Sequence, residues 1–148
     1  MSRPSWDEYF AKIAEDVGRR STCIKSQRQF GAIVVNDKHE IVSTGYNGVV
    51  RGAPHCEEIG CIKDKMNIPS GTGHEVCPAV HAEQNALIQA GRLAKECIMY
   101  LNGFPCKICA RLIVNSGIKK IVCSGTYTDK EGLEILKNAG IEIKHVKI

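Results

Sequence analysis

The sequence contains no apolar run that approaches the roughly 20 residues needed to cross a membrane, so we expect no membrane partner. It also lacks the dense lysine and arginine clusters that are typical of nucleic-acid-binding domains. The formal net charge is only +4 and the pI is about 8.6. Repeats and low-complexity tracts are absent too. We therefore expect no nucleic-acid partner, whereas a small anionic substrate fits this mild positive charge.

A secretory signal is not expected, because the first residues, Met1 to Trp6, lack the basic and then apolar pattern of a signal peptide. The eight cysteines are then expected in the reducing cytoplasm, where metal binding is favoured over disulfides. A length of 148 residues fits one domain, residues 1–148, and 43% hydrophobic with 24% charged residues is typical of a soluble globular protein.

Apolar periodicity predicts an α/β fold. Helical spacing is expected at 5–19, 82–90, 106–116 and 129–139, and strands at 30–35, 40–47, 97–101, 119–123 and 141–146. The first two strands should form a hairpin, and the continuous apolar run of 30–35 should be buried on both faces. Ser5 and Glu8 predict a capping box at the start of the first helix. Three glycines each follow a helix, and the recurring order of helix, glycine and strand is typical of α/β proteins: Gly91, Gly117 and Gly140.

Two short segments carry the chemistry of the chain: His81-Ala82-Glu83 and Pro105-Cys106-Lys107-Ile108-Cys109. Three protein ligands, His81, Cys106 and Cys109, leave a fourth position on zinc open, which is the catalytic arrangement. Glu83 lies close enough to move protons without being a ligand. A Cys-x-x-Cys pair alone is more often half of a structural zinc site or a redox pair, and a Glu at a helix start is commonly a partner of the helix dipole. The combination, in this order, is the signature of zinc nucleobase deaminases.

On these residues the chain resembles the deoxycytidylate (dCMP) deaminases of the zinc-dependent cytidine deaminase superfamily. The resemblance runs from about residue 31 to 142 and is carried by 81–86, 104–110, 116–120 and by Gly45-Tyr46-Asn47-Gly48, which points to the dCMP branch. It implies a cytidine deaminase-like three-layer α/β/α fold with a mixed five-stranded sheet. It also implies zinc-dependent hydrolysis of dCMP to dUMP and ammonia, on the route to thymidylate, in a homo-oligomer that is often a hexamer and is regulated by dCTP and dTTP.

The resemblance also implies roles for single residues. Zinc would be held by the two cysteines and the histidine named above, with Glu83 as the general acid and base. Asn47 would hydrogen-bond the sugar, the Ala82 backbone N–H would contact the base, and Tyr127 lies where the family has a pocket aromatic. The chain departs from the family before Phe104, where members often carry a hydroxyl and this sequence has Leu-Asn-Gly. Asn47 is equally explained as a turn residue and Tyr127 as a packed aromatic.

A monophosphate substrate requires cationic or backbone donors. Lys25, Arg28 and Arg51 flank the expected pocket, and Arg28 is the first choice because its planar guanidinium donates in a fork that matches phosphate. Each of these side chains is equally explained as solvated surface charge.

Residues 48–80 have little periodicity and are long for a loop inside a compact domain, so this segment is expected to be functional or stapled. Four thiolates would close a structural zinc site, as in some members of the resembled family: Cys23, Cys56, Cys61 and Cys77. His74 or His55 could replace one of the thiolates. The alternative is that these are free, buried cysteines that pack as small hydrophobes.

Two rival functions stay open. The first is another zinc deaminase of this fold, acting on dCTP, cytidine, guanine or tRNA adenosine; the mild charge does not favour tRNA. The second is a zinc-stabilised binding module without chemistry, which would leave Glu83 and an open zinc position without a purpose.

Overall fold

A computed structural model describes residues 2–69, 72–126 and 129–148, and its centre is a mixed five-stranded sheet. The strand order is β2 (Ile41–Tyr46), β1 (Gly31–Val35), β5 (Ile98–Leu101), β6 (Lys120–Cys123) and β7 (Glu142–His145). β1 is antiparallel to both neighbours, whereas β5, β6 and β7 are parallel. The predicted hairpin, the five strands and their mixed order are confirmed.

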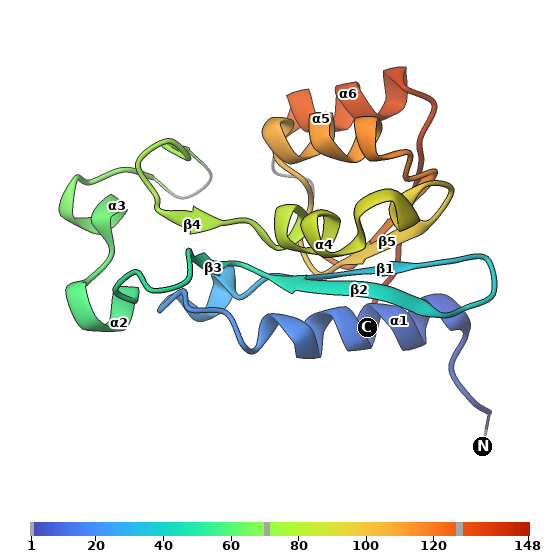
Figure 1. The fold of residues 1–148 in the computed structure, drawn as a ribbon, viewed down its shortest axis with the longest axis horizontal. Coiled ribbons are helices and arrows are strands. Elements are labelled where there is room, and N and C mark those ends of the chain that lie inside the picture. Colours follow the sequence, from blue (N-terminus) through green and yellow to red (C-terminus); the bar gives the residue numbers. More distant parts are fainter. Residues whose placement is uncertain (1, 70–71, 127–128) are drawn as a thin grey trace.

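Helices cover both faces of the sheet, which makes the predicted three layers (Figure 1). α1 (Trp6–Gly18) lies on one face, and α4 (Ala82–Ala90), α5 (Lys107–Ser116) and α6 (Lys130–Asn138) lie on the other. β1 separates two hydrophobic clusters: Ala32 and Val34 pack on the α4 side, and Ile33 and Val35 on the α1 side. All five β1 residues are buried, as its continuous apolar run predicted.

The ends of the helices follow the local sequence. The Ser5 Oγ accepts from the Glu8 N–H at 3.2 Å, and the Glu8 carboxylate accepts from the Ser5 N–H at 3.4 Å, so the predicted capping box is present. Gly117 ends α5 at φ 85°, in the left-handed region that glycine adopts without steric cost.

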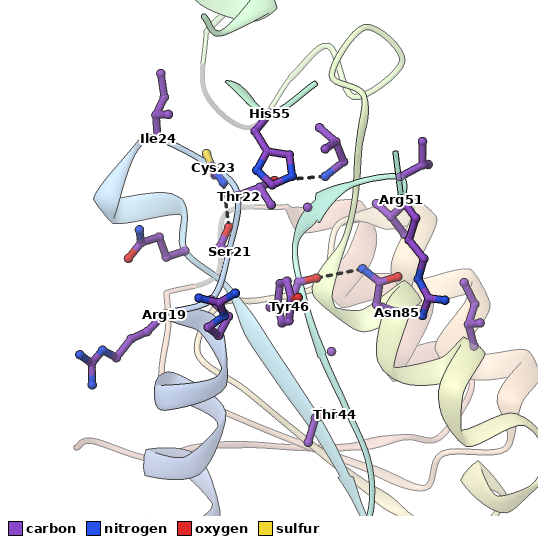
Figure 2. A pocket seen from close by; sticks show the side chains of 18 of the residues that line it. Arg19, Ser21, Thr22, Cys23, Ile24, Thr44, Tyr46, Arg51, His55 and Asn85 are labelled. Atoms are coloured by element: carbon purple, nitrogen blue, oxygen red, sulfur yellow. Dashed lines mark hydrogen bonds between the residues drawn. The ribbon is translucent and has the colours of Figure 1, made fainter. Parts of the chain in front are cut away.

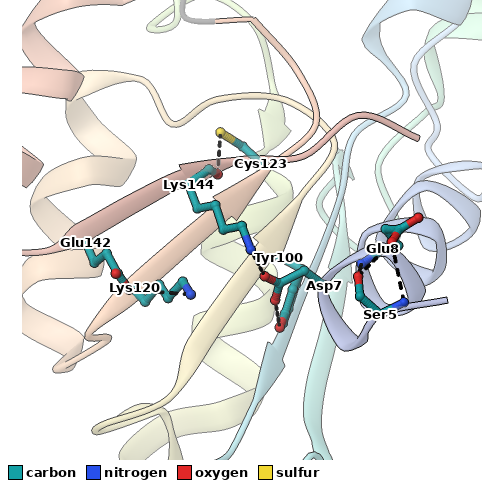
Figure 3. A network of polar contacts seen from close by, with 8 residues as sticks. All are labelled: Ser5, Asp7, Glu8, Tyr100, Lys120, Cys123, Glu142 and Lys144. Atoms are coloured by element: carbon teal, nitrogen blue, oxygen red, sulfur yellow. Dashed lines mark hydrogen bonds and ion pairs between the residues drawn. The ribbon is translucent and has the colours of Figure 1, made fainter.

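A polar network joins α1 to the sheet (Figure 3). The Tyr100 hydroxyl on β5 donates to Asp7 Oδ1 at 2.8 Å, and the Lys144 ammonium on β7 donates to Asp7 Oδ2 at 2.5 Å. Since β5 and β7 are separated by β6, one carboxylate ties α1 to two strands of the parallel half of the sheet.

Residues 48–80 form an extension beyond the end of the sheet that the sequence did not predict in detail (Figure 1). β3 (Gly48–Val49) pairs antiparallel with β4 (Ala79–Val80), and the intervening chain forms α2 (Cys56–Ile59) and α3 (Ile62–Lys65). Elements of one turn or two residues carry too little periodicity to be recognised in a sequence. Two 3₁₀ turns complete the elements, η1 (Ser26–Arg28) and η2 (Gly91–Ala94). Within the described ranges, no helix is long and apolar enough to span a membrane.

α4 is fastened to β2 along its length, and this fixes where the helix begins. The Ser43 hydroxyl donates to the Ala86 carbonyl at 2.8 Å, and the Asn85 amide donates to the Tyr46 carbonyl at 2.9 Å. Gly45 lies between them, and a Cβ there would be 2.5 Å from the Ala82 carbonyl oxygen. The close approach of strand and helix therefore explains the first glycine of the Gly-Tyr-Asn-Gly stretch.

Candidate metal centre

The structure brings His81, Cys106 and Cys109 together as predicted. Their ligand atoms lie within 4.8 Å of one another. His81 Nδ1 is 3.2 Å from Cys109 Sγ and 3.7 Å from Cys106 Sγ. One nitrogen and two sulfurs at this spacing are a soft donor set that fits zinc, with three protein ligands.

Two helix starts aim these ligands at one point. His81 is the residue before α4, and its backbone N–H donates to Gln84 Oε1 at 2.8 Å. Cys106 is the residue before α5, and its Sγ accepts from the Cys109 N–H at 3.5 Å. The positive ends of two helix dipoles therefore meet at the thiols, which favours the thiolate form that binds metals.

The titration behaviour of the cluster agrees with this geometry. A hydrogen bond from Cys109, together with the neighbouring His81, lowers the pKa of Cys106 to about 3 against the opposing effect of burial. The same hydrogen bond, burial and the charge of Glu83 raise the pKa of Cys109. The Cys106 thiolate in turn raises the pKa of His81. Cys106 is thus the thiolate of the pair, and a divalent metal would displace the proton of Cys109 as well.

Glu83 lies in the first turn of α4 and is only 5% exposed. Burial raises the pKa of its carboxyl group, against the opposing effects of its own backbone N–H, the His81 charge and a hydrogen bond with Cys109. A carboxyl group with a raised pKa beside a metal cluster can both accept and donate a proton near neutral pH.

The cluster opens into a cavity of about 680 Å³, which is within the roughly 300–1,000 Å³ of typical ligand pockets. Three of the four predicted substrate residues line it: Arg28, Asn47 and Ala82. The fourth, Tyr127, lies outside the described residues. Asn47 is buried, and its amide accepts from the Phe30 N–H at 2.9 Å and donates to the Arg28 carbonyl at 2.7 Å. One N–H and one lone pair of this amide remain for a ligand.

The three residues considered for binding the phosphate do not all line the same cavity. Arg28 and Lys25 line the cavity, and Lys25 forms an ion pair with Asp64 at 2.6 Å. Arg51 lines a different pocket. Arg51 is therefore not part of the cavity at the metal cluster.

The four cysteines considered for a second zinc site approach one another. Cys56 lies close enough to the other three that the charges of Cys23, Cys61 and Cys77, together with burial, raise its pKa. All four line the same cavity and are free thiols. Although the structure describes all four, no three of them meet the 4.8 Å spacing of the His81 cluster.

One of the two histidines considered beside these thiols, His74, lines the same cavity. His74 packs edgewise against the ring of His81, with ring centroids 5.2 Å apart. His55 precedes α2 and lines the second pocket. This placement favours the thiols as the ligand set of any second metal.

The second pocket has a volume of about 1150 Å³ and lies over β2 and the start of β3 (Figure 2). Figure 2 shows Arg19 and Arg51 on opposite sides of it, with Tyr46 and Asn85 hydrogen-bonded between them. Arg20 and His55 add further positive or titratable groups to its lining.

Sequence reasoning missed three residues of the cavity. Asn102 binds the Gln29 carbonyl and the Gly31 N–H, at 3.0 and 2.9 Å. Asp129 accepts from the Lys107 N–H and the Gly132 N–H, both at 3.0 Å, and so joins the starts of α5 and α6. The third is Lys63 of α3. Asn102 lies where the sequence departs from the family pattern, and this departure was the one feature of the sequence that could have indicated it.

Comparison with known proteins agrees with the fold and the cluster, which together are those of a zinc-binding deaminase. Residues 4–125 match the family model described as the cytidine and deoxycytidylate deaminase zinc-binding region. The chain therefore belongs to the cytidine and deoxycytidylate deaminase family.

Several relatives within this family are deoxycytidylate deaminases. That of Saccharomyces cerevisiae is 37% identical over 147 residues, which cover 97% of this chain and 46% of the relative. That of Mycobacterium phage D29 is 40% identical over 130 residues, covering 82% of this chain and 96% of the relative. A crystal structure of the dCMP deaminase of cyanophage S-TIM5 with dCMP and dUMP superposes with a TM-score of 0.75 at 25% identity, over 99% and 100% of the two chains. The chain spans less than half of the length of the yeast relative.

Proposed function

We propose that this chain hydrolyses the amino group of dCMP to give dUMP and ammonia. The observation that carries the proposal is Glu83, a buried carboxyl group with a raised pKa in the first turn of the helix that begins at the ligand His81. A module that used zinc only for stability would not need this group. Support for the substrate comes from deoxycytidylate deaminases that this chain matches over nearly their whole length, such as that of phage D29.

His81, Cys106 and Cys109 would hold the catalytic zinc. When bound, the metal would lower the pKa of a water molecule and so supply the nucleophile that attacks the carbon bearing the amino group. Glu83 would take the proton of the attacking water and deliver it first to the ring nitrogen and then to the amine, which leaves as ammonia. The Ala82 N–H would orient the base, because α4 begins at this residue and its first N–H groups have no partner within the helix.

The rest of the cavity would hold the nucleotide. Asn47 would present its remaining N–H to the sugar, and Arg28 would lie toward the phosphate, with Tyr127 retained as a predicted pocket aromatic. Support for the first two comes from their place in the lining, and from the amide of Asn47, which fixes the backbone at Arg28.

A second, structural zinc would be held by Cys23, Cys56, Cys61 and Cys77. Support comes from the mutual approach of these thiols around Cys56 and from the shortness of α2 and α3, which bury little surface of their own. Free thiols and two metals suit the reducing cytoplasm.

Regulation and assembly follow from the resemblance. The pocket of Figure 2 would take the effectors dCTP and dTTP, since Arg19, Arg20 and Arg51 in its lining suit a triphosphate. A homo-oligomer, expected as a hexamer, is supported by two exposed apolar side chains. Ile88 on α4 lines this pocket and is 75% exposed, and Leu93 on η2 is 70% exposed. Light scattering of the purified protein would measure the assembly.

An ammonia-release panel tests the function. We expect turnover of dCMP above that of CMP, dCTP, deoxycytidine, adenosine and guanine. Preference for a substrate without a phosphate would refute the proposal, and release from guanine or adenosine alone would identify another deaminase of this fold.

A further inference from the structure

Lys63 is a buried ammonium group without a partner. It lies on α3 of the extension, is 3% exposed, and its Nζ makes no hydrogen bond within the part of the chain that the structure describes. A buried cation is unfavourable unless an anion or hydrogen-bond acceptor compensates it. This side chain therefore requires a negatively charged neighbour that the described contacts do not supply.

Lys63 lines the cavity of the metal cluster, together with His81 and Glu83. His74 also lines this cavity, and its ring packs against that of His81. A ligand whose reacting end lay at the cluster would thus extend toward Lys63.

A second cation, Arg28, lines the same cavity. The backbone of Arg28 is held by the Asn47 amide at 2.7 Å, so the place of Arg28 in the cavity wall is set by the fold. Two positive charges on the wall of one cavity repel each other, and a dianion bound between them would remove that cost.

We infer that Lys63 is the specificity residue that makes this site prefer a 5′-phosphorylated nucleotide over a nucleoside. This inference rests on the proposed deaminase function and adds to it a residue that is not catalytic. The ammonium binds the phosphate dianion, together with Arg28, while the base lies at Glu83. The extension of residues 48–80 then has a function beyond stapling, because it supplies the buried charge that recognises the phosphate.

The neighbouring thiols provide the competing explanation. Cys61 precedes Lys63 by two residues and lines the same cavity with Cys77, so in this explanation the ammonium balances the charge of thiolates on a metal. The two explanations differ in what removal of the charge changes: phosphate preference in one, metal content in the other.

The test compares Lys63→Met with Lys65→Met, a change to an exposed lysine on the same helix. In zinc-loaded protein, K63M should lower kcat/KM for dCMP roughly 10- to 100-fold, chiefly through KM. Its kcat/KM for deoxycytidine should stay within about twofold of the wild type. K65M should change neither, and Lys63→Arg should restore part of the preference because it returns the positive charge.

A binding measurement separates this inference from the proposed function. Calorimetric titration with dUMP and with inorganic phosphate should show weaker binding of both to K63M. If the wild type deaminates dCMP and K63M keeps full preference for dCMP over deoxycytidine, Lys63 is not the specificity residue although the function stands. Loss of one zinc from K63M with unchanged preference would likewise overturn the inference in favour of charge balance at the thiols. If the wild type does not act on dCMP, the proposed function fails, and weaker phosphate binding by K63M would still support the phosphate site.

Discussion

The side-chain amides of Asn47 and Asn102 hydrogen-bond to successive peptide groups of one segment, residues 28–31. Asn47, after β2, pairs with the Arg28 carbonyl and the Phe30 N–H, and Asn102, after β5, pairs with the Gln29 carbonyl and the Gly31 N–H. The segment that leads from η1 into β1 therefore has its backbone groups satisfied by two side-chain amides. Arg28 is the last residue of η1, and these contacts hold the backbone at and after Arg28.

Replacing Asn102 with Ala should loosen this segment. The partly buried Gln29 carbonyl and Gly31 N–H would lose their partner, so we expect a loss of about 1–3 kcal/mol in the free energy of unfolding. KM for dCMP should rise as Arg28 becomes less fixed, with kcat less affected. Urea unfolding and steady-state kinetics measure both effects. Asn138→Ala, a change on the exposed end of α6, is the control; an equal effect of both changes would argue against the positioning of Arg28.

Gly45→Ala should displace the start of α4. The new Cβ would lie 2.4 Å from the Ala86 backbone nitrogen and 2.5 Å from the Ala82 carbonyl oxygen, neither of which can yield without moving the helix. We expect a destabilisation of about 1–3 kcal/mol from overpacking, with weaker zinc binding because His81 begins this helix. Gly48→Ala in the same motif is the matched control, since its Cβ would meet only Thr22 side-chain atoms, the nearest at 3.2 Å. Equal zinc retention in both variants during a chelator titration would contradict this expectation.

The contact between Asp7 and Lys144 predicts how stability changes with pH (Figure 3). Although burial opposes it, hydrogen bonds from Lys144 and Tyr100 hold the pKa of Asp7 below 3.8. The stabilisation from Asp7 is therefore present above the pKa of the unfolded chain, about 3.9, and is lost as the pH falls through the lower folded value. The pKa of Lys144 is raised above 10.5, chiefly by its hydrogen bond to Asp7. The stabilisation that Lys144 contributes is therefore lost only as the pH rises through this raised pKa.

Asp7→Asn should thus reduce stability at pH 7 and flatten the acid side of the profile. Thermal unfolding between pH 2 and 7 measures it, with Asp37→Asn, in the exposed turn between β1 and β2, as the control. A D7N profile as steep as that of the wild type below pH 5 would show that other carboxyl groups account for the acid dependence.

Zinc analysis tests the four thiols. Cys56→Ser should remove one of two zinc equivalents and destabilise the extension, because Cys56 lies close enough to the other three thiols for their charges to raise its pKa. Cys97→Ser, at a buried cysteine outside both clusters, should leave two equivalents per chain. One zinc in the wild-type protein would refute the second site.

The parts that the sequence predicted are those set by neighbouring residues. The capping box of Ser5 and Glu8, the glycine after α5, the apolar run of β1 and the two ligand segments all depend on contacts within a few positions. The hydrogen bonds of Asn102 and the burial of Lys63 depend on residues that come together only on folding. Asn102, for example, is 71 positions from its partner Gly31 in the sequence. No local sequence pattern marks such contacts. α3 is also too short to show a helical pattern in the sequence.

The central claim is that Glu83 moves the proton in a zinc-dependent deamination, and Glu83→Gln tests it most directly. Gln keeps the shape of the side chain and removes its capacity to transfer a proton. We expect the variant to bind as much zinc as the wild type, while its kcat for dCMP falls by at least about 100-fold, as for loss of a general acid and base. Wild-type turnover by E83Q with full zinc content would contradict the account.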